Sequence, residues 1–459
     1  MARVGILGSG ISGLTAAYRL QQAGHEVVVW EATGRAGGVI QSECSQGFLV
    51  EHGPNSLRVS TEALGTLIED IGLSDAIVEA GRESSTRYVV RNGRPVPLPM
   101  SPMDFLTTEL FSARAKIRVL CEPFLSRSPA DEESVASFVR RRLGHEVLDY
   151  AVAPFVGGVF AGRPEALSVQ HAFGRLAALE AEYGSVLWGG LRSALSGTSG
   201  ERPGPSGLFS FRGGLETLPS TLADALGDAI LYHTPVAGLT QTGEAWIVHH
   251  DGTSTAPRQV DALVCTVPLH QFNALSLETS VDCTPLTAVD YPPLRVVALG
   301  FPRQAVDHPL DGFGMLVPPV EDDFDILGTL FSSTLFPNRA PDGHVLLTTF
   351  LGGARNPDLG RASEERVQRL VERDLNQLLG VSGKPVFTRH IHWPNAIPQY
   401  ELGYGTVKAT LRALEGAHPG LFFAGNYRQG VSVGDAVASG AEAASRVAGG
   451  ADGGPLSPD

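Results

Sequence analysis

Lysine is scarce in this sequence of 459 residues: it occurs only at Lys116, Lys384 and Lys408, and arginine supplies the remaining positive charge. No lysine lies between residues 117 and 383. The formal net charge is −14, so the chain lacks the excess of basic residues that binding to nucleic-acid phosphates requires. We therefore expect no nucleic-acid partner.

The four cysteines, Cys44, Cys121, Cys265 and Cys283, are scattered and form no CxxC pair. This spacing argues against a zinc site, an iron–sulfur cluster or a disulfide framework, and we expect no bound metal. The sequence also lacks a run of about 18 consecutive apolar residues, which a membrane-spanning helix would need. A glycine motif stands where a cleavable signal peptide would have to be, so we expect a cytoplasmic protein.

The stretch GILGSGISGLTAAY near the start of the chain carries the first chemical signal. Gly8, Gly10 and Gly13 fit the pattern G-x-G-x-x-G between a predicted strand and a predicted helix, with Ser12 in the first helical turn. Such glycines allow a tight turn, close approach of a pyrophosphate and close helix–strand packing. Glu31 ends the next predicted strand, where a carboxylate can bind a ribose diol. This βαβ unit predicts a dinucleotide site.

The residues after Glu31 indicate which dinucleotide is bound. The stretch EATGRAGGVIQS contains Arg35, Gly37 and Gly38. It resembles the FAD-binding extension of the flavin amine oxidase superfamily, in which the arginine and the glycines lie along the pyrophosphate. An ordinary glycine-rich turn is the alternative. The resemblance implies FAD as the cofactor.

The far end of the chain reads LFFAGNYRQGVSVGDAVASGAEAA, a strand, a glycine loop and a helix of small residues. Small side chains allow such a helix to approach a planar ring, and its positive N-terminal end can stabilise negative charge on a reduced flavin. A simple packing helix is the alternative. The cofactor contacts expected here are Gly425, Asn426, Val431, Ser432 and Val433.

Five stretches resemble the protoporphyrinogen oxidase family, and the resemblance covers essentially the whole chain. They are EHGPNSL at 51–57, RYVVRNGRPVPLP at 87–99, GFGMLVP at 312–318, WPNAIPQYELGY at 393–404 and GNYRQGVSVGD at 425–435. The resemblance implies oxidation of protoporphyrinogen IX to protoporphyrin IX by removal of six electrons in three rounds. The flavin N5 would take a hydride each time, and dioxygen would reoxidise the flavin to give hydrogen peroxide.

The resemblance also implies further cofactor contacts. Gly53, Pro54 and Asn55 should lie close to the flavin ring, and the backbone of Val236 should lie on the adenine side. For Trp393 and Tyr400 two interpretations remain. These aromatic residues either pack at the edge of the flavin or belong to the hydrophobic core.

For the substrate, Arg87 is the best candidate to bind a propionate, because a guanidinium pairs its forked donors with a carboxylate. The sequence predicts a hairpin here, in which TRYVV and RPVPLP flank the turn Arg91-Asn92-Gly93. A surface arginine on this hairpin is the alternative. Gly314, Leu316 and Phe350 resemble positions that line the tetrapyrrole pocket, although they also fit a core. Some family members have an arginine where this chain has Asn55, so coproporphyrinogen III, with four carboxylates instead of two, stays open as the substrate.

The predicted fold class is α/β with several domains. A discontinuous Rossmann-like FAD-binding domain would comprise residues 1–93, 210–285 and 405–450. A β-sheet substrate-binding domain would comprise 286–404, with strands predicted at 294–301, 312–318, 325–333 and 344–351 and a helix at 363–379. A helical subdomain at 94–209 would lie beside them. Its segment LPMSPMDFLTTELFSARAKIRVLCEPFL mixes apolar and basic residues as an interfacial helix does, or packs its apolar face inside the domain. The partners expected are a porphyrinogen, dioxygen, the inner face of the cell membrane and, in a homodimer, a second copy of the chain.

Three other functions compete with this reading. Amine and polyamine oxidases commonly place a lysine near the flavin N5, and the middle of this chain has none. A carotenoid desaturase would accept a longer apolar substrate. A flavin-carrying binding module would hold FAD without turnover and would release no peroxide.

Overall fold

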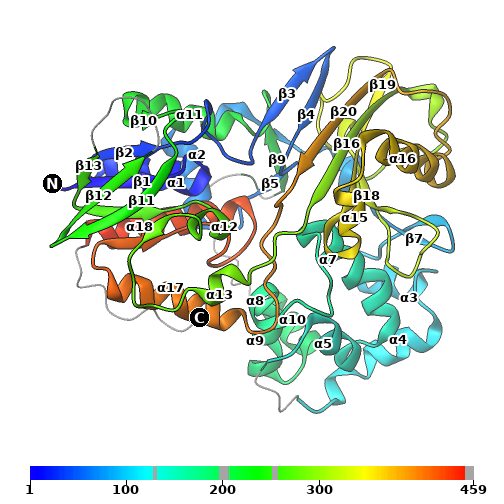
Figure 1. Cartoon of the computed structure of the whole chain (residues 1–459). Helices are drawn as coiled ribbons and strands as arrows, with labels where there is room; N and C mark the ends of the chain where they lie inside the picture. Colours follow the sequence, from blue (N-terminus) through cyan, green and yellow to red (C-terminus); the bar gives the residue numbers. More distant parts are fainter. Residues whose placement is uncertain (128–131, 196–204, 206, 251–256, 450–459) are drawn as a thin grey trace.

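The computed structural model describes residues 1–459 except 128–131, 196–204, 206, 251–256 and 450–459. The two largest sheets have five and seven strands. Figure 1 shows the first beside the N-terminus, the second on the opposite side, and a group of helices below the second. The mixed α/β class predicted from the sequence is confirmed.

The five-stranded sheet is entirely parallel, with the order β10-β2-β1-β14-β21. Its strands are β1 (Arg3–Leu7), β2 (Glu26–Trp30), β10 (Ile230–Leu231), β14 (Ala262–Cys265) and β21 (Leu421–Phe423). Apolar side chains fill both faces, as parallel strands require. The chain order reverses between β1 and β14, and in such sheets ligands bind at the carboxyl ends of the strands at this point.

Three helices cover one face of this sheet, and a second sheet with three further helices covers the other. The helices on the first face are α1 (Ile11–Gln22), α11 (Thr217–Leu226) and α18 (Val433–Ala448), with α2 (Glu62–Asp70) outside them. The second face is covered by β11 (Val236–Thr242), β12 (Ala245–His250), β13 (Arg258–Val260), β15 (Ser276–Leu277), α12 (Leu269–Phe272), α13 (Thr284–Thr287) and α17 (Tyr404–Ala417). The N- and C-terminal segments of the chain therefore share one core.

The seven-stranded sheet has the order β20-β16-β19-β18-β17-β7-β8. Its strands are β7 (Arg87–Arg91), β8 (Arg94–Pro97), β16 (Leu294–Pro302), β17 (Gly314–Leu316), β18 (Ile326–Phe331), β19 (His344–Gly352) and β20 (Phe387–Trp393). Alternate side chains pack against α16 (Glu364–Leu379), which covers one face. The other face looks toward the five-stranded sheet and the helical group.

The β7–β8 hairpin joins this sheet at its edge, although the predicted boundary at residue 93 assigns β7 to the FAD-binding domain. Its two-residue turn has Asn92 at φ 52° and Gly93 at φ 70°, which is the left-handed geometry that Asn-Gly favours in hairpins. The hairpin predicted from this turn is confirmed.

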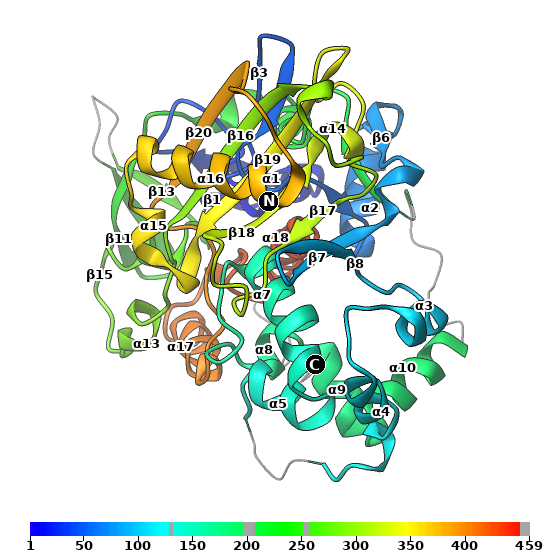
Figure 2. The same ribbon diagram turned by 90° about the vertical axis from the view of Figure 1, so that its right-hand side faces the viewer.

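The described residues between 102 and 195 are mostly helical, as the sequence predicts, and Figure 2 shows this group on one side of the sheets. Its helices are α3 (Pro102–Thr107), α4 (Ala113–Leu120), α5 (Val135–Arg142), α6 (His145–Val147), α7 (Ala153–Phe160), α8 (Val169–Ala172), α9 (Gly174–Tyr183) and α10 (Val186–Leu195), with the turn η3 (Glu122–Phe124). Two small sheets, β3 (Ser42–Ser45) with β4 (Phe48–Glu51), and β5 (Leu57–Arg58) with β9 (Leu208–Phe211) and β6 (Ile77–Glu79), connect the larger ones. The short helices α14 (Ser332–Leu335) and α15 (Pro357–Gly360) complete the fold.

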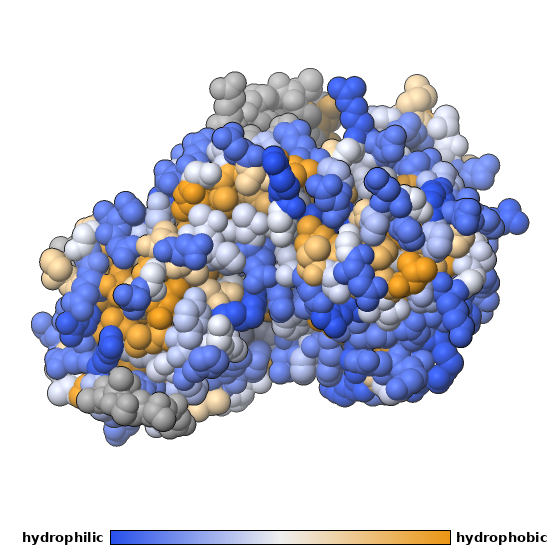
Figure 3. Space-filling model, turned by 90° about the horizontal axis from the view of Figure 1, so that it is seen from above, coloured by the Kyte–Doolittle hydropathy of each residue, from blue (hydrophilic) through white to orange (hydrophobic). Residues whose placement is uncertain are grey.

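Figure 3 shows that apolar residues on the face seen from above form several patches within a mostly hydrophilic surface. Among the residues that the structure describes, no helix is both long enough and apolar enough to span a membrane.

Candidate functional site

The turn between β1 and α1 carries the three glycines of the predicted motif, and each has a different environment. Gly8 has φ +93°, a conformation that favours glycine. A β-carbon on Gly13 would lie 2.1 Å from the carbonyl oxygen of Gly8, so the helix can pack here only without a side chain. A β-carbon on Gly10 would have no protein atom within 4 Å. The turn thus leaves its backbone open to a ligand at Gly10.

The N-terminus of α1 also suits a phosphate group. Its N-cap, Gly10, has no capping side chain, and the first turn contains no acidic residue. The first amides of a helix have no partner inside it and carry partial positive charge. The residues present therefore fit a pyrophosphate at this helix end.

Glu31 follows β2 and faces the same turn. Its carboxylate accepts bonds from the amide and hydroxyl of Ser9, at 3.0 and 2.6 Å, and from the amide and hydroxyl of Thr33, at 2.8 and 2.7 Å. Burial acts to raise the pKa of Glu31, but these hydrogen bonds outweigh it and hold the pKa below its usual range. The carboxylate is therefore ionised at neutral pH and can accept a further bond from a ribose hydroxyl.

Replacing Glu31 by glutamine should lower both the affinity for FAD, by about tenfold, and the stability of the protein. Because the folded-state pKa is lowered, the stabilisation by the carboxylate is present above pH 4.5 and is lost as the pH falls through the folded-state value. The stability difference between wild type and Glu31→Gln should therefore shrink on acidification below pH 4.5. Thermal unfolding of both proteins at a series of pH values measures this stability difference. A stability difference that does not depend on pH would contradict this account.

The loop after Glu31 lies directly beside the glycine turn. The amide of Gly37 donates to the carbonyl of Ser9 at 2.8 Å, and a β-carbon on Gly38 would lie 3.3 Å from the α-carbon of Gly10. The guanidinium of Arg35 donates to the carbonyls of Gly38 and Ile40 and pairs with Glu216 at 3.1 Å. Arg35 thus holds the loop in place, and its contact with the cofactor stays a prediction.

The C-terminal helix α18 brings the other end of the chain to this turn. Ser12 donates to the carbonyl of Ala436 at 2.8 Å, and a β-carbon on Gly440 would lie 2.2 Å from the carbonyl oxygen of Ser12. The two helices therefore pack with their backbones close together. The amide of Gly425 donates to the hydroxyl of Ser439 in α18 at 3.1 Å. The loop that contains Asn426 is therefore held against this helix.

The N-terminus of α18 is capped by its own residues. The hydroxyl of Ser432 accepts from the amide of Asp435 and donates to its carboxylate. The amides of Val433 and Gly434 have no partner inside the helix and are the ones that a flavin oxygen could use. The contacts of Val431, Ser432 and Val433 with the cofactor stay predictions.

Two further segments that are predicted to contact the cofactor begin at Val236 and at Gly53, and the structure places each beside a part of the site already described. Val236 begins β11, after a segment tied to the acidic strand by the bond from the amide of Thr234 to the carbonyl of Glu31, 2.8 Å. Gly53 lies against the loop after Gly38, since a β-carbon there would lie 2.2 Å from the carbonyl oxygen of Val39. Pro54 follows it. The structure thus brings the acidic strand end, the glycine turn and the Gly53 loop into one continuous region.

The two aromatic candidates differ in their environments. Trp393 is half-buried and donates through Nε1 to the carbonyl of His52 at 2.8 Å, next to Gly53. Tyr400 is fully buried, and its hydroxyl binds the carbonyl of Asn426. Tyr400 is therefore a core residue that holds the loop after β21.

Four of the predicted substrate residues, Arg87, Gly314, Leu316 and Phe350, share one face of the seven-stranded sheet. Arg87 on β7 is paired in register with Gly314, which pairs with Leu330. Two residues further along β17, Leu316 pairs with Gly328 of β18, and Gly328 also lies opposite Phe350 of β19. Residues directly opposite on paired strands point to the same face, so strands far apart in sequence bring these candidates together.

Two residues of this face were missing from the sequence prediction. Gly328 lies between Leu316 and Phe350, and Leu330 lies beyond Gly314. Leu316, Leu330 and Phe350 are only partly buried although they lie within the sheet. The alternation of side chains along the predicted strand at 325–333 indicated that Gly328 and Leu330 share one face. Only the register of β18 with its neighbours shows that this is the face of Arg87 and the other predicted substrate residues.

Arg87 itself lies at the edge of this face. Its guanidinium carbon is 5.4 Å from the ring centroid of Phe313, and Nη1 is 4.0 Å from the sulfur of Met100. Burial, and then the positive charge of Arg58, lower the pKa of Arg87. Within the described parts of the chain, no carboxylate pairs with Arg87.

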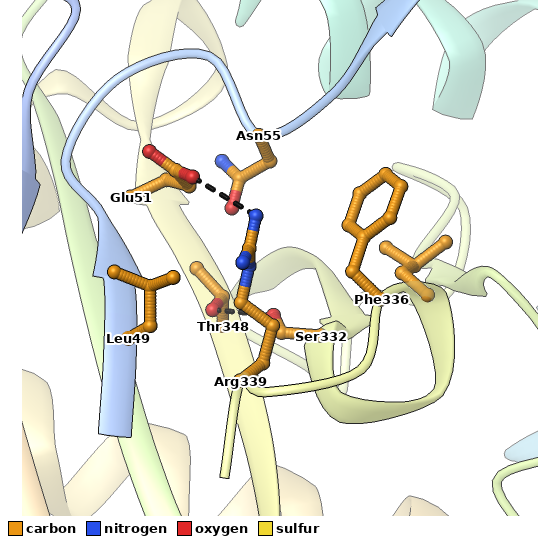
Figure 4. A pocket seen from close by; sticks show the side chains of 8 residues that line it. Leu49, Glu51, Asn55, Ser332, Phe336, Arg339 and Thr348 are labelled. Carbon is orange, nitrogen blue, oxygen red and sulfur yellow. Dashed lines mark hydrogen bonds and ion pairs between the residues drawn. The ribbon is translucent and has the colours of Figure 1, made fainter. Parts of the chain in front are cut away.

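Asn55 lines a small cavity at the other side of this face (Figure 4). Its Nδ2 donates to the carbonyl of Gly53 at 2.9 Å. Beside it, Arg339 pairs with Glu51 at 3.2 Å and donates to Ser210 at 2.6 Å. Burial raises the pKa of Glu51, although the bond from Ser42 and the charge of Arg339 oppose this. This buried pair, which the sequence did not reveal, joins the β3–β4 hairpin to the loop before β19.

No group of three or more His, Cys, Asp or Glu residues within the described ranges could hold a metal ion. The arrangement instead provides an open backbone turn, two helix N-termini and an acidic strand end that fit FAD. Beside them lie the sheet residues Gly314, Leu316, Leu330 and Phe350 with Arg87.

Comparison with known proteins agrees with this assignment. The sequence matches the family described as flavin containing amine oxidoreductase over residues 11–448. Protoporphyrinogen oxidase 2, chloroplastic/mitochondrial, of Arabidopsis thaliana is 37% identical over 477 aligned residues, which cover 97% of this chain and 93% of that protein. Coproporphyrinogen III oxidase of Bacillus subtilis (strain 168) is 28% identical and covers 96% of each chain.

The fold is also similar to that of a solved structure from Exiguobacterium sp. 255-15. The TM-score is 0.82 at 24% identity, and the match covers 97% of this chain and 98% of that chain. With the family match and the 37% identity over nearly the full length, the chain belongs to the flavin-containing amine oxidoreductases and, within them, to the protoporphyrinogen oxidase family of FAD-dependent enzymes.

Proposed function

We propose that this chain oxidises protoporphyrinogen IX to protoporphyrin IX. The observation that carries the proposal is the part of the sheet face on which Arg87, half-buried and without a carboxylate partner among the described residues, adjoins the uncharged residues Gly314, Leu316, Leu330 and Phe350. An apolar ring system with carboxylates on its rim matches such a face. The identity to plant protoporphyrinogen oxidases supports the same substrate.

In this mechanism the protein binds and orients the substrate. FAD, when bound, supplies an acceptor for two electrons and one proton in each round. The guanidinium of Arg87 binds a propionate, while Leu316, Leu330 and Phe350 contact the macrocycle and exclude water. The N-termini of α1 and α18 offer amides to negative charge. Since Gly314, Leu316, Gly328, Leu330 and Phe350 carry no titratable group, we propose that the remaining substrate protons leave to solvent by tautomerisation.

Dioxygen is the proposed final acceptor. Each round transfers two electrons and two protons to one dioxygen, which becomes hydrogen peroxide. Three rounds convert one protoporphyrinogen IX and three dioxygen molecules into one protoporphyrin IX and three hydrogen peroxide molecules.

Aerobic turnover with protoporphyrinogen IX and, in parallel, coproporphyrinogen III tests the proposal. We expect porphyrin fluorescence to rise faster with protoporphyrinogen IX, with about three peroxides released per porphyrin. Coproporphyrinogen III is the weaker candidate, because its oxidase from B. subtilis is only 28% identical. A yellow, FAD-loaded protein that oxidises neither substrate above the buffer rate would overturn the proposal.

We further propose that the helical group rests on the inner face of the cell membrane. Exposed apolar side chains gather there, and η3 contacts both α4 and α10. They are Met100, Met103, Leu106, Ile117, Leu120, Phe124, Leu187, Trp188 and Leu191. Phe124 is 87% exposed, so its ring is available to a lipid surface. Lys116 and Arg118 of the same segment donate to backbone carbonyls, so they also hold the group together.

Vesicle flotation measures this contact. The wild type should float with vesicles that contain anionic lipid, and Phe124→Asp combined with Trp188→Asp should reduce the bound fraction about tenfold. Val386→Asp is a matched control, because Val386 is half-exposed next to the seven-stranded sheet. A wild-type protein that stays wholly unbound would contradict the proposal.

The predicted domain division, cytoplasmic location and homodimer stay predictions.

A further inference from the structure

The β3–β4 hairpin packs on β20, on the sheet face that carries the predicted substrate residues (Figure 1). Phe48 of the hairpin stacks on Phe387 of β20, with ring centroids 4.6 Å apart. Arg389 lies two residues further along β20, so its side chain points to the same face as Phe387. Arg389 also stands in one register row with Arg87, through Ala298, Thr348, Leu330 and Gly314. The hairpin therefore contacts the face on which Arg87 lies.

Glu43 of this hairpin binds two partners at once. Its carboxylate accepts a forked pair of hydrogen bonds from Arg389, one from Nε at 2.8 Å and one from Nη2. The second partner is His52, whose Nε2 lies 3.2 Å from the same carboxylate. The bond from Arg389 holds the pKa of Glu43 below its usual range, and burial lowers the pKa of His52. At neutral pH a neutral imidazole therefore donates through Nε2 to an ionised carboxylate.

His52 is held through its backbone as well. Its amide donates to the carbonyl of Gln41 at 2.8 Å. Its carbonyl accepts from Nε1 of Trp393 at 2.8 Å, and Trp393 lies on the same face of β20 as Arg389. Both the side chain and the backbone of His52 are thus connected to β20.

The next residue continues this connection to the glycine turn. A β-carbon on Gly53 would lie 2.2 Å from the carbonyl oxygen of Val39, so the two backbones are in close contact. Val39 follows Gly38, which lies against the α-carbon of Gly10. A continuous series of contacts therefore runs from β20 to the open turn that fits the pyrophosphate.

We propose that Arg389, Glu43 and His52 are positioning residues, which hold the Gly53–Asn55 loop and thereby fix the flavin relative to the substrate face. The proposal rests on porphyrinogen oxidation at this face and on the predicted contact of the loop with the flavin ring. The three residues act through the loop. Their effect on the rate can be large, because a displacement of about 1 Å between reacting groups can cost about 100-fold.

The test is rapid mixing of the FAD-loaded protein with protoporphyrinogen IX without oxygen, followed by flavin absorbance. Arg389→Gln should slow flavin reduction about tenfold, because the loop is no longer held in place. The FAD content and the KM should stay within about twofold of wild type, since Arg87 is untouched. Arg3→Gln is the matched control, because Arg3 is 47% exposed in its ion pair and Arg389 is 46% exposed. It should reduce its flavin at the wild-type rate.

Further variants separate positioning from a general loss of stability. His52→Gln keeps an N–H donor for Glu43 and should stay within about twofold of the wild-type rate, whereas His52→Leu should be as slow as Arg389→Gln. The double variant Glu43→Gln/Arg389→Gln should be no slower than either single variant, because both substitutions break the same link.

Circular dichroism of the visible flavin band gives a readout without turnover, because the band responds to the groups around the bound ring. Arg389→Gln should change this band, and Arg3→Gln should not. A wild-type rate of flavin reduction or an unchanged band in Arg389→Gln would overturn the proposal while the proposed function stands. A wild-type protein whose FAD is not reduced by the porphyrinogen would overturn the proposed function. The flavin band of Arg389→Gln would then still decide whether these residues hold the loop at the flavin.

Discussion

Replacing Gly10 by alanine should lower the affinity for FAD about 100-fold and leave the apoprotein within about 1 kcal/mol of wild-type stability. The added methyl group would meet no protein atom within 4 Å, and the backbone at φ −65° and ψ 169° accepts alanine. The methyl group would, however, occupy the space through which a pyrophosphate approaches the turn. The substitution should therefore weaken cofactor binding and leave the stability of the fold nearly unchanged.

Gly13→Ala in the same turn should behave differently. Its β-carbon would lie 2.1 Å from the carbonyl oxygen of Gly8 and 2.7 Å from Oγ1 of Thr266, so backbone must move. Overpacking of this kind typically costs about 1–3 kcal/mol, and occasionally more. We expect Gly13→Ala to lose both thermal stability and FAD binding.

Titration of apoprotein with FAD, followed by flavin fluorescence, and thermal unfolding without FAD separate the two variants. Gly190→Ala is the control, because a β-carbon on this exposed helical glycine meets nothing within 4 Å and lies in α10, away from the turn. If Gly10→Ala bound FAD as tightly as the wild type, the cofactor would not approach Gly10.

Arg142→Met should destabilise the helical group by about 3–5 kcal/mol, because it leaves the carboxylate of Glu122 buried without its partner. Both side chains are fully buried and form an ion pair. The same carboxylate accepts from the amide of Val186 at 3.0 Å, and Arg142 donates to the carbonyl of Gly184 at 2.7 Å. The pair thus joins α5, η3 and the start of α10.

The double variant Arg142→Met/Glu122→Leu should recover most of this loss, since two apolar residues of similar volume often replace a buried pair without net cost. Urea unfolding, together with hydrogen exchange of residues 113–192, measures the effect where it is expected. A matched control is Arg3→Met, because Arg3 belongs to an ion pair with Glu26 that is about half exposed. Equal midpoints for the wild type and Arg142→Met would show that the pair does not stabilise this group.

Features that depend on neighbouring residues followed from the sequence. The glycine turn, the strand ending at Glu31 and the Asn92–Gly93 hairpin are fixed by local backbone conformation, and the structure contains all of them. The helix predicted at 363–379 is α16 (Glu364–Leu379), because its apolar side chains recur at helical spacing. The local pattern predicted a dinucleotide, and the resemblance of the stretch after Glu31 to the flavin amine oxidase superfamily implied that it is FAD.

The sequence did not show which residues meet across the sheet. Arg87 and Gly314 are more than 200 positions apart, and their neighbourhood depends on the parallel pairing of β7 with β17. Gly328 and Leu330 join the candidates only through the register of β18 with its neighbours. A shift of one residue would turn every one of these side chains to the opposite face.

The same limit applies to the buried charges. Arg142 looks like one of three consecutive arginines on a solvated helix, yet it is fully buried against Glu122. The sequence by itself determined the glycine turn, the start of the helix after it and the strand end at Glu31, because each of these needs only residues close along the chain. The tertiary structure decided the substrate face and the pairing of charges, because these depend on strand order, register and burial between distant segments.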